Sequence, residues 1–176
     1  MLPESLSIRR TDKIVYQQGD VLLQISVPHC GSRYTQGLLE AMGCKVEGHH
    51  VGNCQLWKEE FRSRPAVVPL RDPYKCFLTW WKEEIDEDSE LQSSLGCFGM
   101  WNALDSLLYT RRQFGAKTIL WRVDQETEQD LADRLGLTVP NVDISRHAHF
   151  ITDKYVEPVR QEFPDDLQNI AVRWGY

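Results

Sequence analysis

Apolar residues in this chain form short runs, separated by longer stretches in which they recur with helical spacing. The runs at residues 19–27, 65–70 and 116–123 are largely apolar, which is typical of strands buried on both faces of a parallel sheet. A shorter and more polar run at residues 44–50 is predicted to be a further strand. The pattern therefore predicts four strands.

The stretches around these runs have the periodicity of helices. Asp72 is suited to the N-cap of one helix and Pro73 to its first turn, where the missing N–H costs nothing. Gly43, Gly115 and Gly136 stand where the end of a helix favours a left-handed residue. Helices are expected at residues 32–42, from 73 onward, 99–114, 127–136, 153–163 and 164–176.

The alternation of strands and helices predicts the fold class. We expect an α/β fold with three layers, in which a parallel sheet with right-handed crossovers is flanked by helices. No linker, repeat or low-complexity tract divides the chain, so a single domain spanning residues 1–176 is expected. Ligands of such sheets bind beyond the carboxyl ends of the strands.

Composition narrows the class of protein. Hydrophobic residues make up 41% and charged residues 26%, as in globular domains, and no apolar run approaches the ~20 residues that span a bilayer. The first residues lack the apolar middle of a signal peptide, so we expect a cytoplasmic protein without a membrane partner. A formal charge of −6 argues against a nucleic-acid surface. Five irregularly spaced cysteines favour reduced thiols over a disulfide framework.

The segment SVPHCGSRYT, residues 26–35, joins the first strand to the first helix. Backbone N–H groups around Cys30, Gly31, Ser32 and Arg33 would point at an anion on the helix N-terminus, although the Gly-Lys-Ser/Thr nucleotide signature is absent from the chain. The alternative is an ordinary turn in which Ser32 is the N-cap.

A second stretch, RDPYKCFLT, follows the third strand. Arg71 follows the third strand, at the end of the sheet where the first loop is expected, and could contact a phosphate with two hydrogen bonds. Thr79 lies about two turns into the following helix. The alternative is that Arg71 pairs with Asp72 or another carboxylate and that Thr79 is a helix-packing residue.

A third stretch, GHHVG, ends the second strand. His49 or His50 could act as a general base, but strand side chains alternate between faces, so at most one of them should enter a site. The alternative is a histidine bonded to a backbone carbonyl. A zinc site with Cys44 and Cys54 is disfavoured because the spacing fits no strong zinc pattern, so no metal is expected.

Together these stretches resemble the sulfotransferases that use 3′-phosphoadenosine 5′-phosphosulfate (PAPS). The first motif of that family is a strand followed by Pro-Lys/Arg-Ser-Gly-Thr-Thr/Ser. Pro28, Gly31 and Ser32 match it in register, whereas His29 stands at the basic position and Cys30 at the serine.

The second family motif, Arg-Asp/Asn-Pro followed by Ser or Thr, is matched by Arg71, Asp72, Pro73 and Thr79 with the family's spacing. Weaker likeness extends over most of residues 20–176. The family's later Gly-rich motif has no clear counterpart in this chain, and the chain is short for the family.

The resemblance implies a P-loop NTPase-like sulfotransferase fold and a function. PAPS would be the co-substrate, bound through its phosphosulfate by the backbone from Cys30 to Tyr34 and through its 3′-phosphate by Arg71 and Thr79. The sulfuryl group would pass to a hydroxyl of a small molecule, carbohydrate or protein.

The resemblance also implies two roles in catalysis. His29, together with Arg33, would stabilise the leaving oxygen. His49 or His50 would take the acceptor's proton, and His49 matches the family's position better. Two alternatives remain open: a nucleotide phosphotransferase, and a nucleotide-binding protein without catalysis.

Overall fold

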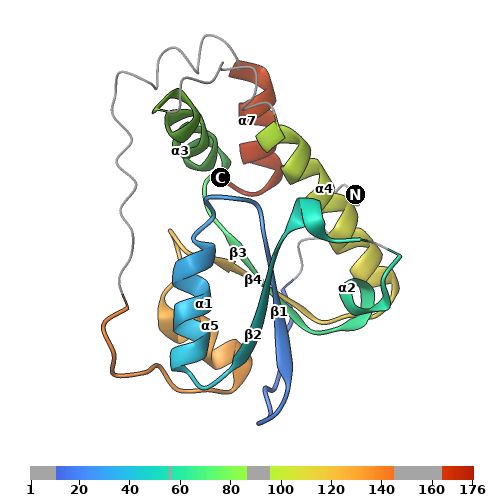
Figure 1. Ribbon diagram of the computed structural model, residues 1–176, viewed down its shortest axis with the longest axis vertical. Coiled ribbons are helices and arrows are strands. Elements are labelled where there is room, and N and C mark those ends of the chain that lie inside the picture. The colour runs from blue at the N-terminus through green and yellow to red at the C-terminus, as the bar shows by residue number, and fades with distance from the viewer. Residues whose placement is uncertain (1–10, 56, 87–95, 145–163) are drawn as a thin grey trace.

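The structure is a computed structural model that describes residues 11–55, 57–86, 96–144 and 164–176. Its centre is a four-stranded parallel sheet in the order β2-β1-β3-β4 (Figure 1). The strands are β1 (Val21–Ser26), β2 (Lys45–His50), β3 (Ala66–Leu70) and β4 (Thr118–Arg122). The predicted parallel α/β architecture is confirmed.

The helices follow the predicted order. They are α1 (Ser32–Ala41), α2 (Glu59–Ser63), α3 (Pro73–Asp86), α4 (Gly96–Gln113), α5 (Glu128–Leu135) and α7 (Pro164–Arg173), with a 3₁₀ turn η2 (Val51–Asn53) after β2. The sequence did not predict α2 or η2, because elements of three to five residues are too short to show a period. The helix expected at residues 153–163 lies outside the described residues.

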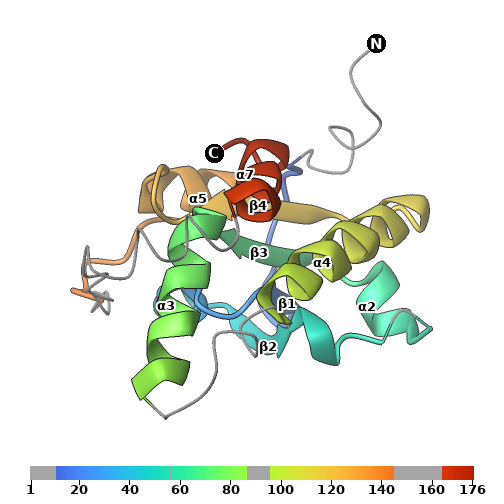
Figure 2. The ribbon, with the colours of Figure 1, turned by 90° about the horizontal axis from the view of Figure 1, so that it is seen from above.

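Helices cover both faces of the sheet (Figure 2). On one face Leu22, Val67 and Ile119 pack with the apolar residues of α1 and α5. On the other face Leu23 and Val68 join a core to which α2, α3, α4 and α7 contribute. Figure 1 shows α3 and α7 beyond the end of the sheet at which β1 and β3 finish.

The order of the strands creates a topological switch point between β1 and β3. The chain crosses from β1 to β2 by way of α1 on one face, and it returns past α2 to β3 on the opposite face. Open α/β sheets bind ligands in the crevice beyond the carboxyl ends of the strands at such a point. The loops that follow β1 and β3 meet there. Flavodoxin-like sheets share this order, so the order alone does not define the ligand.

Among the described residues, no helix has the length and apolar character needed to cross a membrane.

Candidate anion-binding site

The loop after β1 turns sharply through two left-handed residues. His29 has φ 65°, the one positive value of a non-glycine residue in the described chain, and Gly31 has φ 78°. Gly31 is the N-cap of α1, and no side chain caps it. The alternative of a serine N-cap is therefore wrong, because Ser32 is already the first helical residue.

Gly31 is needed for a second reason besides its left-handed backbone. A Cβ atom at this position would lie 3.2 Å from Cγ2 of Val123, at the end of β4. A side chain would therefore be strained and would also push the loop off its neighbour.

The N-terminus of α1 presents backbone donors. The first hydrogen bond of the helix runs from the Thr35 N–H to the Gly31 carbonyl at 2.9 Å. The N–H groups of Ser32 and Arg33 precede it and meet no acceptor in the described part of the chain. Such groups and the helix dipole attract anions.

Two polar side chains of β1 lie next to this loop. The Gln24 Nε2 amide donates to the Ser32 carbonyl at 2.9 Å and fixes the first turn of α1 on β1. Gln24 Oε1 and Ser26 Oγ are buried, and neither has a hydrogen-bond partner among the described residues. Buried polar atoms without a hydrogen-bond partner are uncommon in proteins. Two of them lie in the strand that precedes this loop.

Arg71 joins the loop to α3. Its Nη1 donates to the His29 carbonyl at 3.1 Å and to Thr79 Oγ1 at 3.4 Å. Thr79 is buried, and its hydroxyl donates to the Lys75 carbonyl one turn earlier. The structure thus brings together the loop, Arg71 and Thr79, three features that the sequence had singled out separately.

The alternative pairing of Arg71 with Asp72 is wrong. Asp72 Oδ1 instead accepts from the Tyr74 N–H at 2.9 Å and caps α3, as predicted. No carboxylate in the described ranges forms an ion pair with Arg71. The guanidinium therefore has donors and charge beyond those its two neutral partners use.

Asp124 ties the ends of β3, β4 and α7 together. Its Oδ2 accepts from the Asp72 N–H at 3.0 Å, and its Oδ1 accepts from the Tyr176 hydroxyl at 3.0 Å. Burial, together with the Asp124 carboxylate, holds the pKa of Tyr176 well above its usual value. The sequence did not show this clamp, because its partners lie 52 residues apart.

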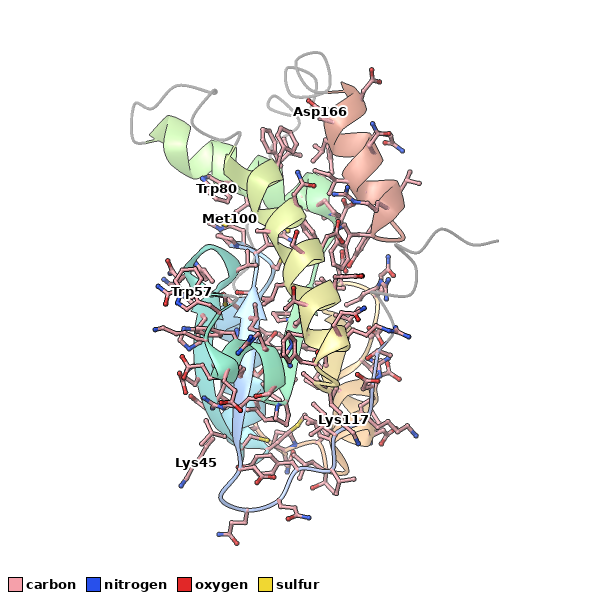
Figure 3. All side chains as sticks on the ribbon, turned by 90° about the vertical axis from the view of Figure 1, so that its right-hand side faces the viewer. Lys45, Trp57, Trp80, Met100, Lys117 and Asp166 are labelled. Carbon is pink, nitrogen blue, oxygen red and sulfur yellow. The ribbon has the colours of Figure 1, made fainter. Side chains whose placement is uncertain are left out.

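The remaining side chains of the loop point in different directions. The His29 ring packs edge-on against Trp80 with centroids 5.9 Å apart, and Figure 3 shows Trp80 at the end of the sheet opposite Lys45 and Lys117. Arg33 is exposed. Tyr34 stacks on Trp121 and donates its hydroxyl to Glu128, so its side chain lies on the α5 side of α1.

His49 and His50 face opposite sides of β2, as predicted, and align with Ile25 and Ser26 of β1. His49 Nε2 lies 2.9 Å from Glu47 Oε1, and its ring packs edge-on against Phe61. Its partner is thus a carboxylate, not the backbone carbonyl of the alternative. His50 is exposed.

The Glu47 carboxylate has two partners, His49 and Arg64. The hydrogen bond from His49, followed by the contact with Arg64 at 3.3 Å, lowers the pKa of Glu47. Among the described residues, no hydrogen bond or ion pair joins His49 or His50 to the loop or to Arg71. The predicted base therefore stands one strand away from the loop.

A cavity of about 360 Å³ lies elsewhere, between α1, α5 and the segment that follows α5. Its lining is largely apolar, with the carboxylates of Glu128 and Asp143. The part of the chain that the structure describes holds no group of three His, Cys, Asp or Glu side chains placed to bind a metal ion.

Comparisons with protein-family models, curated proteins and solved structures give no significant match for this chain. The resemblance to sulfotransferases therefore rests on the sequence motifs alone.

Proposed function

We propose that this chain binds PAPS and transfers its sulfuryl group to a hydroxyl. One observation carries the proposal: at the switch point of the sheet, Arg71 contacts both the carbonyl of the loop and the hydroxyl of Thr79. A guanidinium that has no carboxylate partner among the described residues, next to a helix N-terminus, suits a ligand with two anionic groups.

Each anionic group has its own set of donors in this proposal. The N–H groups of Ser32 and Arg33 bind the phosphosulfate, where backbone donors stabilise charge that develops on the leaving oxygen. Arg71 and Thr79 bind the 3′-phosphate, which distinguishes PAPS from ordinary adenine nucleotides. The side chains of His29 and Arg33 add positive charge at the loop.

His49 is the proposed general base. Glu47 orients the imidazole through Nε2, so Nδ1 is the nitrogen that takes the acceptor's proton. The carboxylate also stabilises the imidazolium that forms. Replacing His49 by Ala should lower turnover by about 10²-fold or more without weakening nucleotide binding.

The nucleotide phosphotransferase is the less favoured alternative. Asp124 is the carboxylate after a strand that could have bound magnesium, but both of its oxygens accept hydrogen bonds from Asp72 and Tyr176. A nucleotide-binding protein without catalysis would bind the same ligand, and its His49→Ala variant would behave like the parent in every assay.

The test is calorimetric titration of the chain with 3′-phosphoadenosine 5′-phosphate (PAP), 5′-AMP, and ATP with magnesium. The proposal predicts that PAP binds most tightly and without added metal. Magnesium-dependent binding of ATP would assign the chain to the phosphotransferases. If none of the three ligands binds, the chain is not a nucleotide-binding protein of this kind and the proposal is wrong.

A further inference from the structure

Two buried thiols touch each other at the loop. Cys30 Sγ and Cys76 Sγ lie 3.3 Å apart, although the residues are 46 positions apart in the sequence. Both residues are 0% exposed. A disulfide needs a sulfur–sulfur distance of about 2.05 Å, so a movement of roughly 1.2 Å would join them.

The pair links the two halves of the proposed anion site. Cys30 directly precedes Gly31, the N-cap of α1. Cys76 lies in the first turn of α3, and its thiol approaches the His29 carbonyl at 3.5 Å and the Arg71 carbonyl at 3.8 Å. A bond between the two sulfurs would therefore tie the loop after β1 to the segment after β3.

The other described cysteines, Cys44 and Cys54, lack such a neighbour. Neither has a second sulfur within hydrogen-bond distance among the described residues. Proximity thus singles out Cys30 and Cys76.

We propose that Cys30 and Cys76 form a peroxide-sensitive thiol pair, whose disulfide draws the loop toward α3 and weakens anion binding at the N-terminus of α1. Formation of the disulfide stands on the geometry of the pair alone. The effect on nucleotide binding rests on the proposed function.

The chemistry balances with hydrogen peroxide as the oxidant. One thiol loses its proton, and the thiolate attacks a peroxide oxygen; the O–O bond breaks, a sulfenic acid forms, and the hydroxide that leaves takes up the released proton as water. The second thiol attacks the sulfenic sulfur, the S–O bond breaks, and the S–S bond forms as the hydroxyl leaves with the thiol proton as water. Two electrons pass from the two sulfurs to the peroxide. A reducing thiol such as dithiothreitol reverses the change.

The physical reason for weaker binding is displacement of the donors. The loop reaches its geometry through left-handed residues on either side of Cys30, at His29 and Gly31. Drawing Cys30 toward α3 shifts the adjacent N–H groups by a distance of the order of 1 Å. Hydrogen bonds lengthened or misaligned by that amount are much weaker, so the anion is bound less tightly.

The first readout needs no ligand. The full chain, purified under reducing conditions, is treated with hydrogen peroxide, its remaining thiols are alkylated, and its peptides are identified by mass spectrometry. We expect a peptide pair joined between Cys30 and Cys76, together with slower hydrogen exchange at the amides of residues 27–35. Alkylation of Cys30 and Cys76 after the peroxide treatment, or a bridge from either of them to another cysteine, would overturn the proposal.

The second readout is the affinity for PAP before and after oxidation. We expect at least a tenfold loss on oxidation and full recovery with dithiothreitol. Cys76→Ser keeps a hydroxyl donor near the loop carbonyls, so it should bind as the reduced parent does and ignore peroxide. Cys54→Ser is the matched control and should respond as the parent does.

The two readouts distinguish failure of the proposed function from failure of the thiol switch. If the reduced chain binds no PAP, the proposed function fails, and the bridge is still judged by mass and by hydrogen exchange. If the bridge forms and the affinity for PAP is unchanged, the thiol pair is not a switch of the site.

Discussion

Arg111 is a fully buried cation that donates four hydrogen bonds within the described part of the chain, all of them to uncharged oxygens. It donates to the carbonyls of Phe61, Arg64 and Lys117 and to the hydroxyl of Thr118. Desolvation lowers its pKa to about 10, which leaves it charged at neutral pH. One side chain thus joins α2, α4 and β4 on the face opposite α1.

Arg111→Met should therefore destabilise the fold strongly. The change leaves several buried carbonyls without donors, and we expect the free energy of unfolding to fall by about 3 kcal/mol. Urea denaturation measures the loss. Lys117→Met, at an exposed position, is the control and should change stability by less than about 0.5 kcal/mol. Equal effects of the two substitutions would contradict this role for Arg111.

Gly31 offers a second test at the scale of one residue. Gly31→Ala places a Cβ on a left-handed residue and against Val123, whereas Gly115→Ala has a similar φ of 69° with open space around it. The control should lose about 1 kcal/mol from backbone strain. Gly31→Ala should lose more than that in urea denaturation and should also weaken PAP binding. Identical losses would mean that the contact with Val123 has no effect.

Motif spacing in the sequence indicated one contact of the site, between Arg71 and Thr79, but not the contact between Cys30 and Cys76. The family motif pairs Arg71 with Thr79, and the structure places the two side chains in hydrogen-bond contact. The contact between Cys30 and Cys76 depends on how α3 packs against the loop. Tertiary contacts of this kind leave no local pattern in a single sequence.

At the scale of elements, the cap of α3 fixes where Arg71 leaves the sheet. Asp72→Ala removes the acceptor of the Tyr74 N–H and should cost about 1 kcal/mol in urea denaturation. Asp72→Asn keeps a capping oxygen and should stay close to the parent. If Ala and Asn at this position behave alike, the cap does not stabilise α3.

Elements with a clear pattern were predicted well. Three strands lie within apolar runs, and the ends of α1 and α5 fall beside the glycines that the sequence indicated. The start of α1 was less clear, because both Gly31 and Ser32 are acceptable N-caps, and the left-handed backbone at Gly31 and its contact with Val123 appear only in the structure.

At the scale of the whole molecule, the order of the strands had to come from the structure. Alternation of strands and helices predicts a parallel sheet, but it does not say that β1 lies between β2 and β3. That order is what places the two motif loops side by side at one end of the sheet. It also leaves His49 on the outermost strand β2, where its partner is Glu47.

The contact between Glu47 and His49 predicts how the stability of the fold depends on pH. The pKa of Glu47 is lowered in the folded chain, so its contribution is complete above its ordinary pKa of 4.5 and is lost as the pH falls through the lowered value. Urea denaturation between pH 6 and about pH 3 should show a smaller decline for Glu47→Gln than for the parent. Glu59→Gln, at an exposed position, is the control and should keep the parent's slope. Equal slopes for Glu47→Gln and the parent would contradict the coupling.

The most direct measurement is the affinity of the parent and of Arg71→Ala for PAP and for 5′-AMP, by calorimetric titration. The account predicts that the parent prefers PAP and that the preference disappears in Arg71→Ala, with a loss of about 10- to 100-fold for PAP and little change for 5′-AMP. Arg33→Ala, which alters an exposed cation of the loop, should keep the preference. A preference for PAP that survives Arg71→Ala would contradict the assignment of Arg71 to the 3′-phosphate.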